Sequence, residues 1–271
     1  MGISDGKEGR SILEIDNVSY SYKPSLPRVM EDVSININEG EFFVLLGPSG
    51  CGKTTVLNQV AGFEHPTAGE IRLEGKPIEG PGPERAVVFQ GHDSLLGWQT
   101  VRKNVEFPLR VAGASAEERQ RAAQRALEMV ELADQAEKYP HELSGGMKQR
   151  VQIARGLVTD ARTILMDEPF GALDAQTRQA LQLELSDIWS KERRTVLFIT
   201  HDIAEAVILA DRVGVMSAGP SAYLHSIVDI DLPRPRKRTA GFTEQVNELE
   251  NIVAAAKARR PVNSESPKVA S

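Results

Sequence analysis

The segment from Gly47 to Thr54 constrains the fold of this chain more than any other stretch. It reads Gly-Pro-Ser-Gly-Cys-Gly-Lys-Thr and follows an apolar run at 42–46. Its glycines allow a tight turn in which successive backbone N–H groups converge on phosphate oxygens. In the pattern G-x-x-x-x-G-K-[ST], the lysine reaches the β- and γ-phosphates and the hydroxyl holds Mg²⁺. We therefore expect a nucleoside triphosphate to contact Gly47, Pro48, Ser49, Gly50, Cys51, Gly52, Lys53, Thr54 and Thr55.

The sequence on either side of this loop supports the same interpretation. Residues 42–46 have the length and apolarity of a buried strand, and 55–61 continue as a helix that Gly62 can end. Such a helix directs its free N–H groups and its positive dipole end at the phosphates. The order strand, loop, helix thus favours a phosphate site over a glycine-rich turn that carries a surface lysine.

The strand patterns fall into two kinds. Residues 12–22 and 33–37 alternate, which predicts a half-exposed antiparallel sheet with Val18, Tyr20 and Tyr22 on one face. Residues 163–166 and 195–199 are continuously apolar, as in parallel strands that are covered on both faces. Further strands are expected at 71–74, 86–89, 213–216 and 223–230. The strand at 86–89, short and buried, places Gln90 at its end.

Helical patterns occupy the middle of the chain, between these strands. Ser115-Ala116-Glu117-Glu118 is a capping box, and apolar residues follow it at helical spacing. A second helix is expected from Ser144, and a third from Asp174 with Leu181, Leu185, Ile188 and Trp189 on one stripe. The fold class is therefore α/β, with an antiparallel β lobe, the phosphate loop, an inserted helical lobe and a parallel core.

Composition and chain ends narrow the function classes. Lys and Arg number 32 against 38 Asp and Glu, a net charge of −6 that argues against nucleic acid as a partner. The only cysteine, Cys51, cannot form an intramolecular disulfide, suits a reducing compartment and is interpreted as a small filler rather than a redox switch. No run approaches the ~18 apolar residues of a membrane span, so another chain must cross the bilayer in any membrane process.

Three segments near the chain ends remain outside these lobes. The polar segment Met1–Arg10 is expected to be frayed. The basic run Pro233–Arg238 breaks regular structure, and we expect it to be solvated rather than to bind lipid head groups. Residues 244–259 predict one modest helix, interpreted as a surface-packed tail rather than a regulatory or partner-binding segment.

Two acids close one of the buried strands, in Met166-Asp167-Glu168-Pro169. An aspartate at this place can orient Mg²⁺, and the neighbouring glutamate can act on the water that attacks the γ-phosphate. Adjacent acids at a strand end are common, so this catalytic assignment depends on the phosphate loop upstream.

The segment Leu143–Arg150, which reads LSGGMKQR, adds a family resemblance. Here the chain resembles the ATP-binding cassette proteins, over about residues 12 to 230. Other elements of that family match in order: Tyr22 before the loop, Gln90, the Ala-Leu-Asp run that ends at Asp174, and His201 after an apolar strand. The resemblance implies a P-loop, RecA-like core with an antiparallel β subdomain and an inserted helical subdomain.

The same resemblance implies residue roles. Tyr22 would stack on adenine, Gln90 would sense Mg²⁺ and water, Glu168 would polarise the attacking water and His201 would contact the γ-phosphate. It also implies a head-to-tail dimer in which each signature, Ser144-Gly145-Gly146, completes the ATP site of the other copy and Asp174 crosses the interface. The expected divisions are a disordered 1–11, a nucleotide-binding domain at 12–240 with a helical subdomain at about 91–160, and a helical tail at 241–271.

A finer resemblance concerns residues 95–105, Leu-Leu-Gly-Trp-Gln-Thr-Val followed by Asn-Val after two further residues. This stretch looks like LLPW-x-TV-x-x-NV of the nitrate, sulfonate and taurine importers, with Gly97 in place of the usual proline. The ending Asp231–Arg236 also resembles that subfamily. Trp98 is open to two interpretations, an aromatic that anchors the helical lobe and a contact to the permease.

The resemblance implies the ATPase of a bacterial importer for a small solute, peripheral on the cytoplasmic face of the membrane. Its partners would be integral-membrane permease subunits, a second nucleotide-binding subunit and, indirectly, a solute-binding protein. A soluble cassette that switches a non-membrane partner is the alternative. A P-loop kinase is a third hypothesis, but it leaves the LSGG element unexplained.

Overall fold

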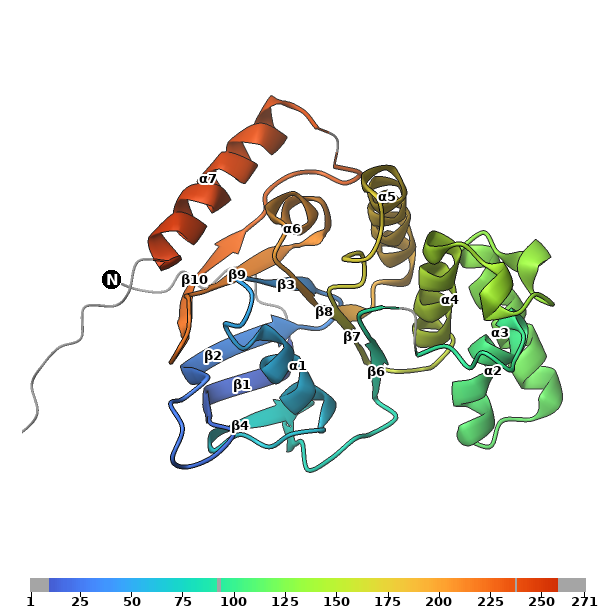
Figure 1. Ribbon diagram of the computed structural model, residues 1–271, viewed down its shortest axis with the longest axis horizontal. Coiled ribbons are helices and arrows are strands. Elements are labelled where there is room, and N and C mark those ends of the chain that lie inside the picture. The colour runs from blue at the N-terminus through green and yellow to red at the C-terminus, as the bar shows by residue number, and fades with distance from the viewer. Residues whose placement is uncertain (1–9, 92–93, 237, 258–271) are drawn as a thin grey trace, which may run out of the picture.

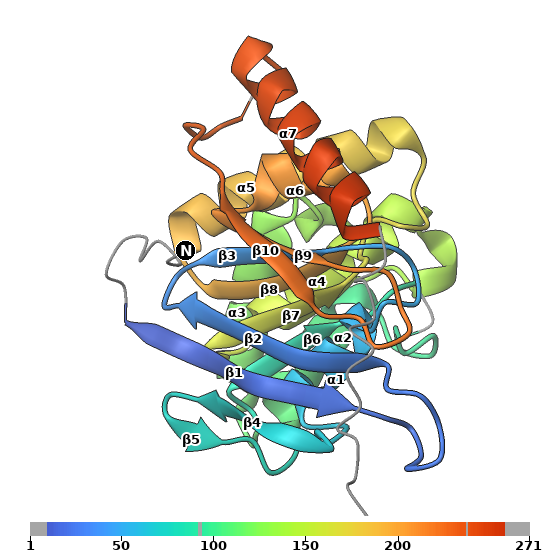
Figure 2. The ribbon, with the colours of Figure 1, turned by 90° about the vertical axis from the view of Figure 1, so that its left-hand side faces the viewer.

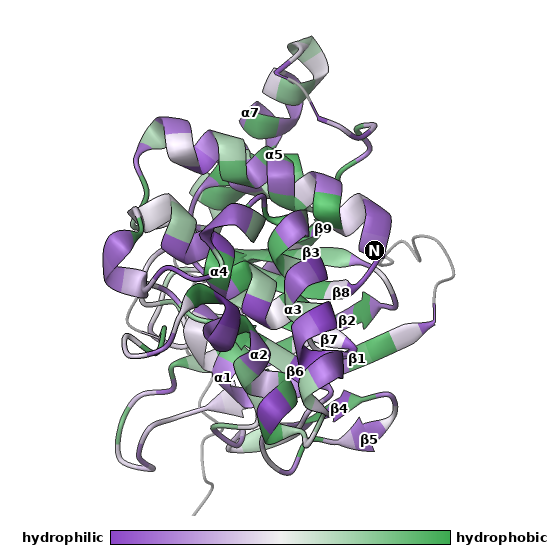
Figure 3. Ribbon diagram, turned by 90° about the vertical axis from the view of Figure 1, so that its right-hand side faces the viewer, coloured by the Kyte–Doolittle hydropathy of each residue, from purple (hydrophilic) through white to green (hydrophobic). Residues whose placement is uncertain are grey.

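The computed structural model describes residues 10–91, 94–236 and 238–257, so most of the segment expected to be frayed lies outside the described residues. Two sheets stack in the body of the molecule, and a group of helices stands to one side of them (Figure 1). In the described part of the chain, no helix is both long and apolar enough to cross a bilayer. Figure 3 shows hydrophilic and hydrophobic residues mixed along α3, α4 and α5.

A six-stranded sheet forms the centre, in the order β10-β9-β3-β8-β7-β6. Neighbouring strands are parallel except for β10, which pairs antiparallel with β9. The strand bounds are β3 Phe42–Leu46, β6 Arg85–Val88, β7 Thr163–Asp167, β8 Thr195–Thr200, β9 Arg212–Met216 and β10 Leu224–Asp229. The apolar runs predicted as parallel strands covered on both faces are β7 and β8, and every residue of both is buried or nearly so. By contrast, β6 is an edge strand and only half-buried.

Alternate residues of β3 pack into two separate hydrophobic cores. Phe42, Val44 and Leu46 pack with the helices on one face of the sheet. Phe43 and Leu45 pack on the other face with helix α1 (Lys53–Ala61) and with the second sheet. This period of two is the geometry of any strand, and here both faces are covered, so the run reads as continuously apolar.

The second sheet is four-stranded and antiparallel, in the order β2-β1-β4-β5. Its strands are β1 Ser11–Tyr20, β2 Met30–Asn38, β4 Ala68–Leu73 and β5 Lys76–Pro77, and they lie in the lower half of Figure 2. Of the three residues expected on one face, Val18 is buried and Tyr20 packs against the same core, but the expectation is wrong for Tyr22. The register shifts on both sides of Val18, Asn17 has φ +48°, Ser19 is buried, and Tyr22 lies beyond the strand and is 63% exposed. A bulge therefore interrupts the simple alternation.

The helices divide into two groups. Helices α4 (Gly145–Leu157), α5 (Ala175–Glu192), α6 (Ile203–Leu209) and α7 (Ala240–Lys257) share one hydrophobic core with the sheet. Helices α2 (Val101–Val111) and α3 (Ala116–Met129) pack on α4, at the right of Figure 1. Short 3₁₀ turns follow at Ala133–Gln135 and Pro140–Glu142. Ser115 caps α3 through the predicted capping box, and the predicted α5 stripe is buried.

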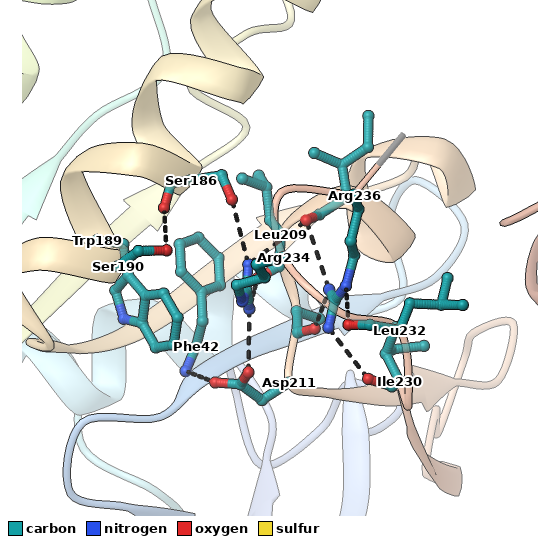
Figure 4. Close-up of polar contacts among 12 residues, drawn as sticks. Phe42, Ser186, Trp189, Ser190, Leu209, Asp211, Ile230, Leu232, Arg234 and Arg236 are labelled. Carbon is teal, nitrogen blue, oxygen red and sulfur yellow. Dashed lines mark hydrogen bonds and ion pairs between the residues drawn. The ribbon is translucent and has the colours of Figure 1, made fainter. Parts of the chain in front are cut away.

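The basic run was expected to be solvated, and for Arg234 and Arg236 that expectation is wrong (Figure 4). Arg236 is 5% exposed and donates hydrogen bonds to the carbonyls of Val207, Ala210 and Ile230. Two of these carbonyls belong to the C-terminal end of α6, where unpaired acceptors and the negative dipole end favour a cation. Burial lowers the pKa of Arg236 to about 10, and the guanidinium fixes the chain before it enters α7.

Arg234 lies beside it and is held differently. Its guanidinium carbon stands 4.3 Å from the centre of the Trp189 ring, and its Nη2 is 3.0 Å from Asp211 Oδ1. Asp211 in turn accepts a hydrogen bond from the Phe42 N–H, at the start of β3. The segment therefore ties α5, α6 and the central sheet together. Beyond it, α7 packs on α6 and β9 and buries Phe242, Leu249 and Ala256.

Candidate nucleotide-binding and catalytic site

The phosphate loop connects β3 to α1, as the sequence predicts. Gly50 and Gly52 have φ of +79° and +91°, a region that favours glycine, and Gly52 is the N-cap of α1. Lys53 is 5% exposed, and its Nζ donates to the carbonyls of Gly47 and Pro48 at 2.9 and 3.0 Å. The ammonium group thus lies across the loop, where phosphate oxygens can replace these carbonyls as its partners.

The two acids lie at the carboxyl end of β7. Asp167 is buried, and its Oδ1 accepts a hydrogen bond from the Thr54 hydroxyl at 3.3 Å. Burial raises the pKa of Asp167, and the neighbouring Glu168 adds to the rise, while Thr54 and Lys53 oppose it. The loop and the β7 terminus therefore meet through a direct contact between a hydroxyl and a carboxylate.

Glu168 joins three parts of the site. Its carboxylate lies 3.9 Å from Lys53 Nζ and 3.0 Å from Nδ1 of His201, the residue that follows β8. Its backbone has φ +40°, a left-handed conformation that is uncommon outside glycine, and its N–H bonds to the Ile199 carbonyl. Strained backbone of this kind persists where the surrounding structure fixes it, and here two neighbouring strand ends do so.

An open cleft of about 830 Å³ lies in front of the loop. Tyr22 and Gln90 line it together with much of the phosphate loop and Glu168. The Gln90 amide is close to the turn after Glu168, since a Cβ added to Gly171 would lie 3.4 Å from Gln90 Nε2. The predicted site residues that line this cleft are Tyr22, Pro48, Ser49, Gly50, Gly52, Lys53, Thr54, Thr55, Gln90 and Glu168.

Cys51 lies behind the loop rather than in the cleft. It is 1% exposed and belongs to the core around β3, which is the place of a small filler. Burial raises the pKa of its thiol, which keeps the thiol neutral and unreactive. Gly47 is also tightly packed, because an added Cβ would lie 2.9 Å from the Met216 Cβ.

Two further walls of the cleft were not predicted from the sequence. One is the segment before β2, with Arg28 and Val29, and the other is the segment 218–220 after β9. The N–H groups of Ser221 and Ala222 donate to the carbonyls of Arg28 and Val29, at 2.7 and 3.1 Å. The dipeptide Gly219-Pro220 indicates a turn, but no local pattern shows that this turn lies beside the phosphate loop.

The signature residues lie elsewhere in the described structure. Ser144 is the N-cap of α4 and accepts the Met147 N–H at 3.3 Å, and Gly146 packs on Thr177 so closely that an added Cβ would be 2.6 Å away. Among the described residues, Ser144, Gly145 and Gly146 do not line the cleft. Helix α4 packs in the core on the sheet face opposite α1.

Asp174, the residue that the resemblance places at a dimer interface, is the exposed N-cap of α5. Its carboxylate accepts the N–H groups of Gln176 and Thr177 at 3.1 and 3.0 Å, and these hydrogen bonds lower its pKa. It is likewise outside the cleft among the described residues. The structure thus gathers the phosphate-binding and carboxylate residues and leaves the signature and Asp174 on other surfaces.

The stretch at 95–105 forms a loop at 95–100 and the first turn of α2. The buried Asn104 side chain accepts the Leu96 N–H at 2.8 Å and donates to the Leu96 and Gln99 carbonyls. Trp98 is 74% exposed, so its interpretation as a core anchor is wrong. The loop holds an aromatic side chain out from the helical lobe.

A parallel sheet with a phosphate loop after β3 and paired acids at the end of β7 defines a P-loop nucleoside triphosphatase. Residues 30–171 match the model of the family described as ABC transporter. The chain therefore belongs to the ABC transporter family, and it is an ATP-hydrolysing cassette with the predicted P-loop fold.

Curated relatives cover most of the chain. The nitrate import ATP-binding protein NrtD of Synechococcus elongatus is 48% identical over 213 residues, 78% of this chain and 77% of that protein. The taurine import ATP-binding protein TauB of Chromobacterium violaceum is 49% identical over 215 residues, 79% and 82% of the two chains. The bicarbonate transport ATP-binding protein CmpD of Synechococcus elongatus is 47% identical over 230 residues, 83% and 82%. The predicted nitrate, sulfonate and taurine subfamily is thereby confirmed.

A solved structure shows the same fold. It is the dimeric ATP-binding cassette in a post-hydrolysis state bound to ADP and Pi, with 30% identity and a TM-score of 0.69. The match covers 82% of this chain and 100% of that one.

Proposed function

We propose that this chain is the ATPase subunit of an importer for a small anionic solute of the nitrate, sulfonate or taurine kind. The observation that carries the proposal is the exposed Trp98 loop on a cassette whose relatives are import proteins for such solutes. The bicarbonate relative widens the solute class to a further small anion. Because the cassette faces ATP and not the solute, the partner permease selects the solute.

The contacts in the cleft support specific roles for its residues. Tyr22, exposed and held edge-on by Tyr20 at 5.3 Å between ring centres, offers a face on which adenine stacks. Lys53 exchanges its loop carbonyls for β- and γ-phosphate oxygens. Glu168 accepts the proton of the attacking water. His201, which is hydrogen-bonded to Glu168, contacts the γ-phosphate.

The Thr54 hydroxyl and the Asp167 carboxylate fit Mg²⁺, which prefers oxygen ligands and takes most of the others from phosphates and water. Within the described residues, no cluster of three or more His, Cys, Asp or Glu side chains offers an all-protein metal site, which agrees with this division of ligands. Gln90 is the third protein group that we assign to the ion and the water. When bound, the ion neutralises charge on the β- and γ-phosphates.

The position of the signature supports a dimer. Ser144 caps an exposed helix start, the kind of place that binds anions, yet it lies outside its own cleft. We propose that Ser144, Gly145 and Gly146 bind the γ-phosphate held by a second copy, that Asp174 crosses that interface, and that the dimer is the working unit. ATP favours closure because its γ-phosphate contacts both copies, and hydrolysis removes those contacts.

We further propose that the dimer binds a membrane-spanning permease on the cytoplasmic face and receives solute indirectly from a binding protein. Co-expression of the chain with its permease tests this proposal. The full chain is then expected in the membrane fraction. A Trp98→Ala variant is expected to leave the membrane fraction while its ATP hydrolysis in detergent-free solution is unchanged. A wild-type chain that stays cytosolic beside its permease contradicts import and favours a soluble cassette that acts on another partner.

A further inference from the structure

A buried carboxylate that none of these roles uses lies behind the catalytic residues. A small cavity of about 40 Å³ is lined by Glu168 and His201 together with Arg178, Asp202 and Glu205. Glu205 is 4% exposed, and it belongs to the first turn of α6. Taking a carboxylate out of water is costly unless hydrogen bonds replace the lost solvation. Its partners therefore show what the position does.

Each oxygen of Glu205 binds a different element. Oε2 accepts the hydroxyl of Thr200 at 2.6 Å, and Thr200 is the last residue of β8, directly before His201. Oε1 accepts the side-chain amide of Gln182 at 3.0 Å, and Gln182 lies on α5 and is 5% exposed. The Glu205 carboxylate is thus a bridge between the turn that carries His201 and the middle of α5.

The surrounding contacts make this bridge stiff. Thr200 Oγ1 also accepts the Asp202 N–H at 3.0 Å, and Asp202 Oδ1 accepts the Glu205 N–H at 3.1 Å. Arg178, one turn before Gln182 on α5, lies 3.8 Å from the Asp202 carboxylate. His201 therefore sits on a turn whose hydrogen bonds leave it few alternative positions relative to α5.

Helix α5 has a special place, since Asp174 is its N-cap and is the residue assigned to the dimer interface. A helix moves as a rigid rod, so a shift at its N-terminus reaches Gln182 two turns later. We propose that Glu205 is a positioning residue for ATP hydrolysis, which transmits the position of α5 to His201 and so aligns His201 when two copies close. This inference rests on the proposed role of His201.

Replacing Gln182 with methionine tests the bridge. Methionine keeps the length, the helix propensity and most of the packing, but it removes the amide that Glu205 binds. Gln179→Met makes the same chemical change at an exposed position of the same helix and is the control. For the full-length chain we expect Q182M to lower kcat about tenfold, with KM for ATP changed less than about twofold. The control is expected to match the wild type.

Substitution of Glu205 itself separates positioning from packing. Glutamine can accept from Gln182 and donate to Thr200, so Glu205→Gln is expected to keep most of kcat, whereas Glu205→Met is expected to fall as Q182M does. The double variant Q182M/E205M is expected to be no slower than E205M, because both changes break the same bridge. Circular dichroism melts report the folded fraction, to which every kcat is normalised.

The inference is overturned if Q182M and E205M retain wild-type kcat per folded molecule, if only KM changes, or if their losses add in the double variant. A His201→Ala variant distinguishes this result from failure of the proposed site. Wild-type hydrolysis by H201A would remove His201 from the mechanism. An inactive H201A beside fully active Q182M and E205M would reject the bridge alone.

Discussion

At the scale of single residues, Glu168 has the most contacts that bear on chemistry, with Lys53 on one side and His201 on the other. Replacing it with glutamine preserves size but removes the negative charge that accepts a proton from water. We expect Glu168→Gln to lower ATP turnover about a hundredfold or more, while ATP binding stays within about twofold of the wild type because the phosphate loop is untouched.

Phosphate release and equilibrium ATP binding, measured on the same preparation, check this expectation. Glu192→Gln, an exposed change at the end of α5, serves as the control. Unchanged turnover in E168Q would remove Glu168 from the role of general base. Loss of binding together with turnover would instead assign it to the binding of ATP.

Functional residues could be predicted best where their neighbours in the fold are also close in the sequence. The phosphate loop and the acids after β7 follow from strand and loop patterns that lie within a few residues of one another. Arg28 and the segment 218–220 could not be predicted, because hydrogen bonds between distant segments place them at the cleft. The face assigned to Tyr22 was wrong because β1 ends at Tyr20, whereas the alternating pattern continues through Tyr22 and does not show this end.

Among the helices and strands, α4 and α5 are joined by an ion pair that includes a carboxyl group with a raised pKa. Glu184 on α5 lies 2.8 Å from Arg150 on α4, and burial, opposed by Arg150, raises its pKa to about 7. A raised carboxyl pKa means that the folded state binds the proton more tightly than the unfolded state does. Stability from this group is therefore full below the ordinary carboxyl range and is lost as the pH rises to about 7.

We expect Glu184→Gln to reduce the fall in stability between pH 5 and pH 8, because glutamine does not titrate. Urea unfolding at several pH values measures the difference, with the exposed Asp187→Asn on the same helix as the control. Parallel pH profiles for E184Q and the wild type would show that Glu184 does not titrate in this range.

The segment between β10 and α7 gives a second prediction for elements. Arg236 binds carbonyls of α6 and of Ile230, and its removal leaves these buried acceptors unpaired. We expect Arg236→Met to lower the free energy of unfolding by about 3 kcal/mol. The exposed Arg238→Met is expected to have little effect. Equal unfolding free energies for the two variants would contradict a structural role for Arg236.

This segment also shows why burial could be predicted for some elements and not for others. Strands β7 and β8 are continuously apolar, so their burial on both faces could be predicted. A run of arginines and prolines resembles a solvated surface, and only the fold brings the carbonyl end of α6 beside it. Buried arginines of this kind cannot be recognised from the charge pattern alone.

For the whole molecule, we propose that one copy holds ATP but cannot hydrolyse it alone. The cleft supplies Lys53 and Glu168, while Ser144 lies on another surface. In the dimer that we propose, two copies lie head to tail and join the loop of each to the signature of the other, so that each ATP needs residues from both chains. Lys53→Ala removes the loop half of this site, and Ser144→Arg blocks the signature half.

Mixing these two variants tests whether the two copies share each ATP site. Each alone is expected to hydrolyse ATP at a small fraction of the wild-type rate. A mixed dimer contains one site with both defects and one with none, so random pairing of equal amounts is expected to restore about a quarter of wild-type activity. The measurement is phosphate release before and after the two purified variants are combined. A mixture no more active than its separate components, or full-rate hydrolysis by either variant as a monomer, would contradict the shared site.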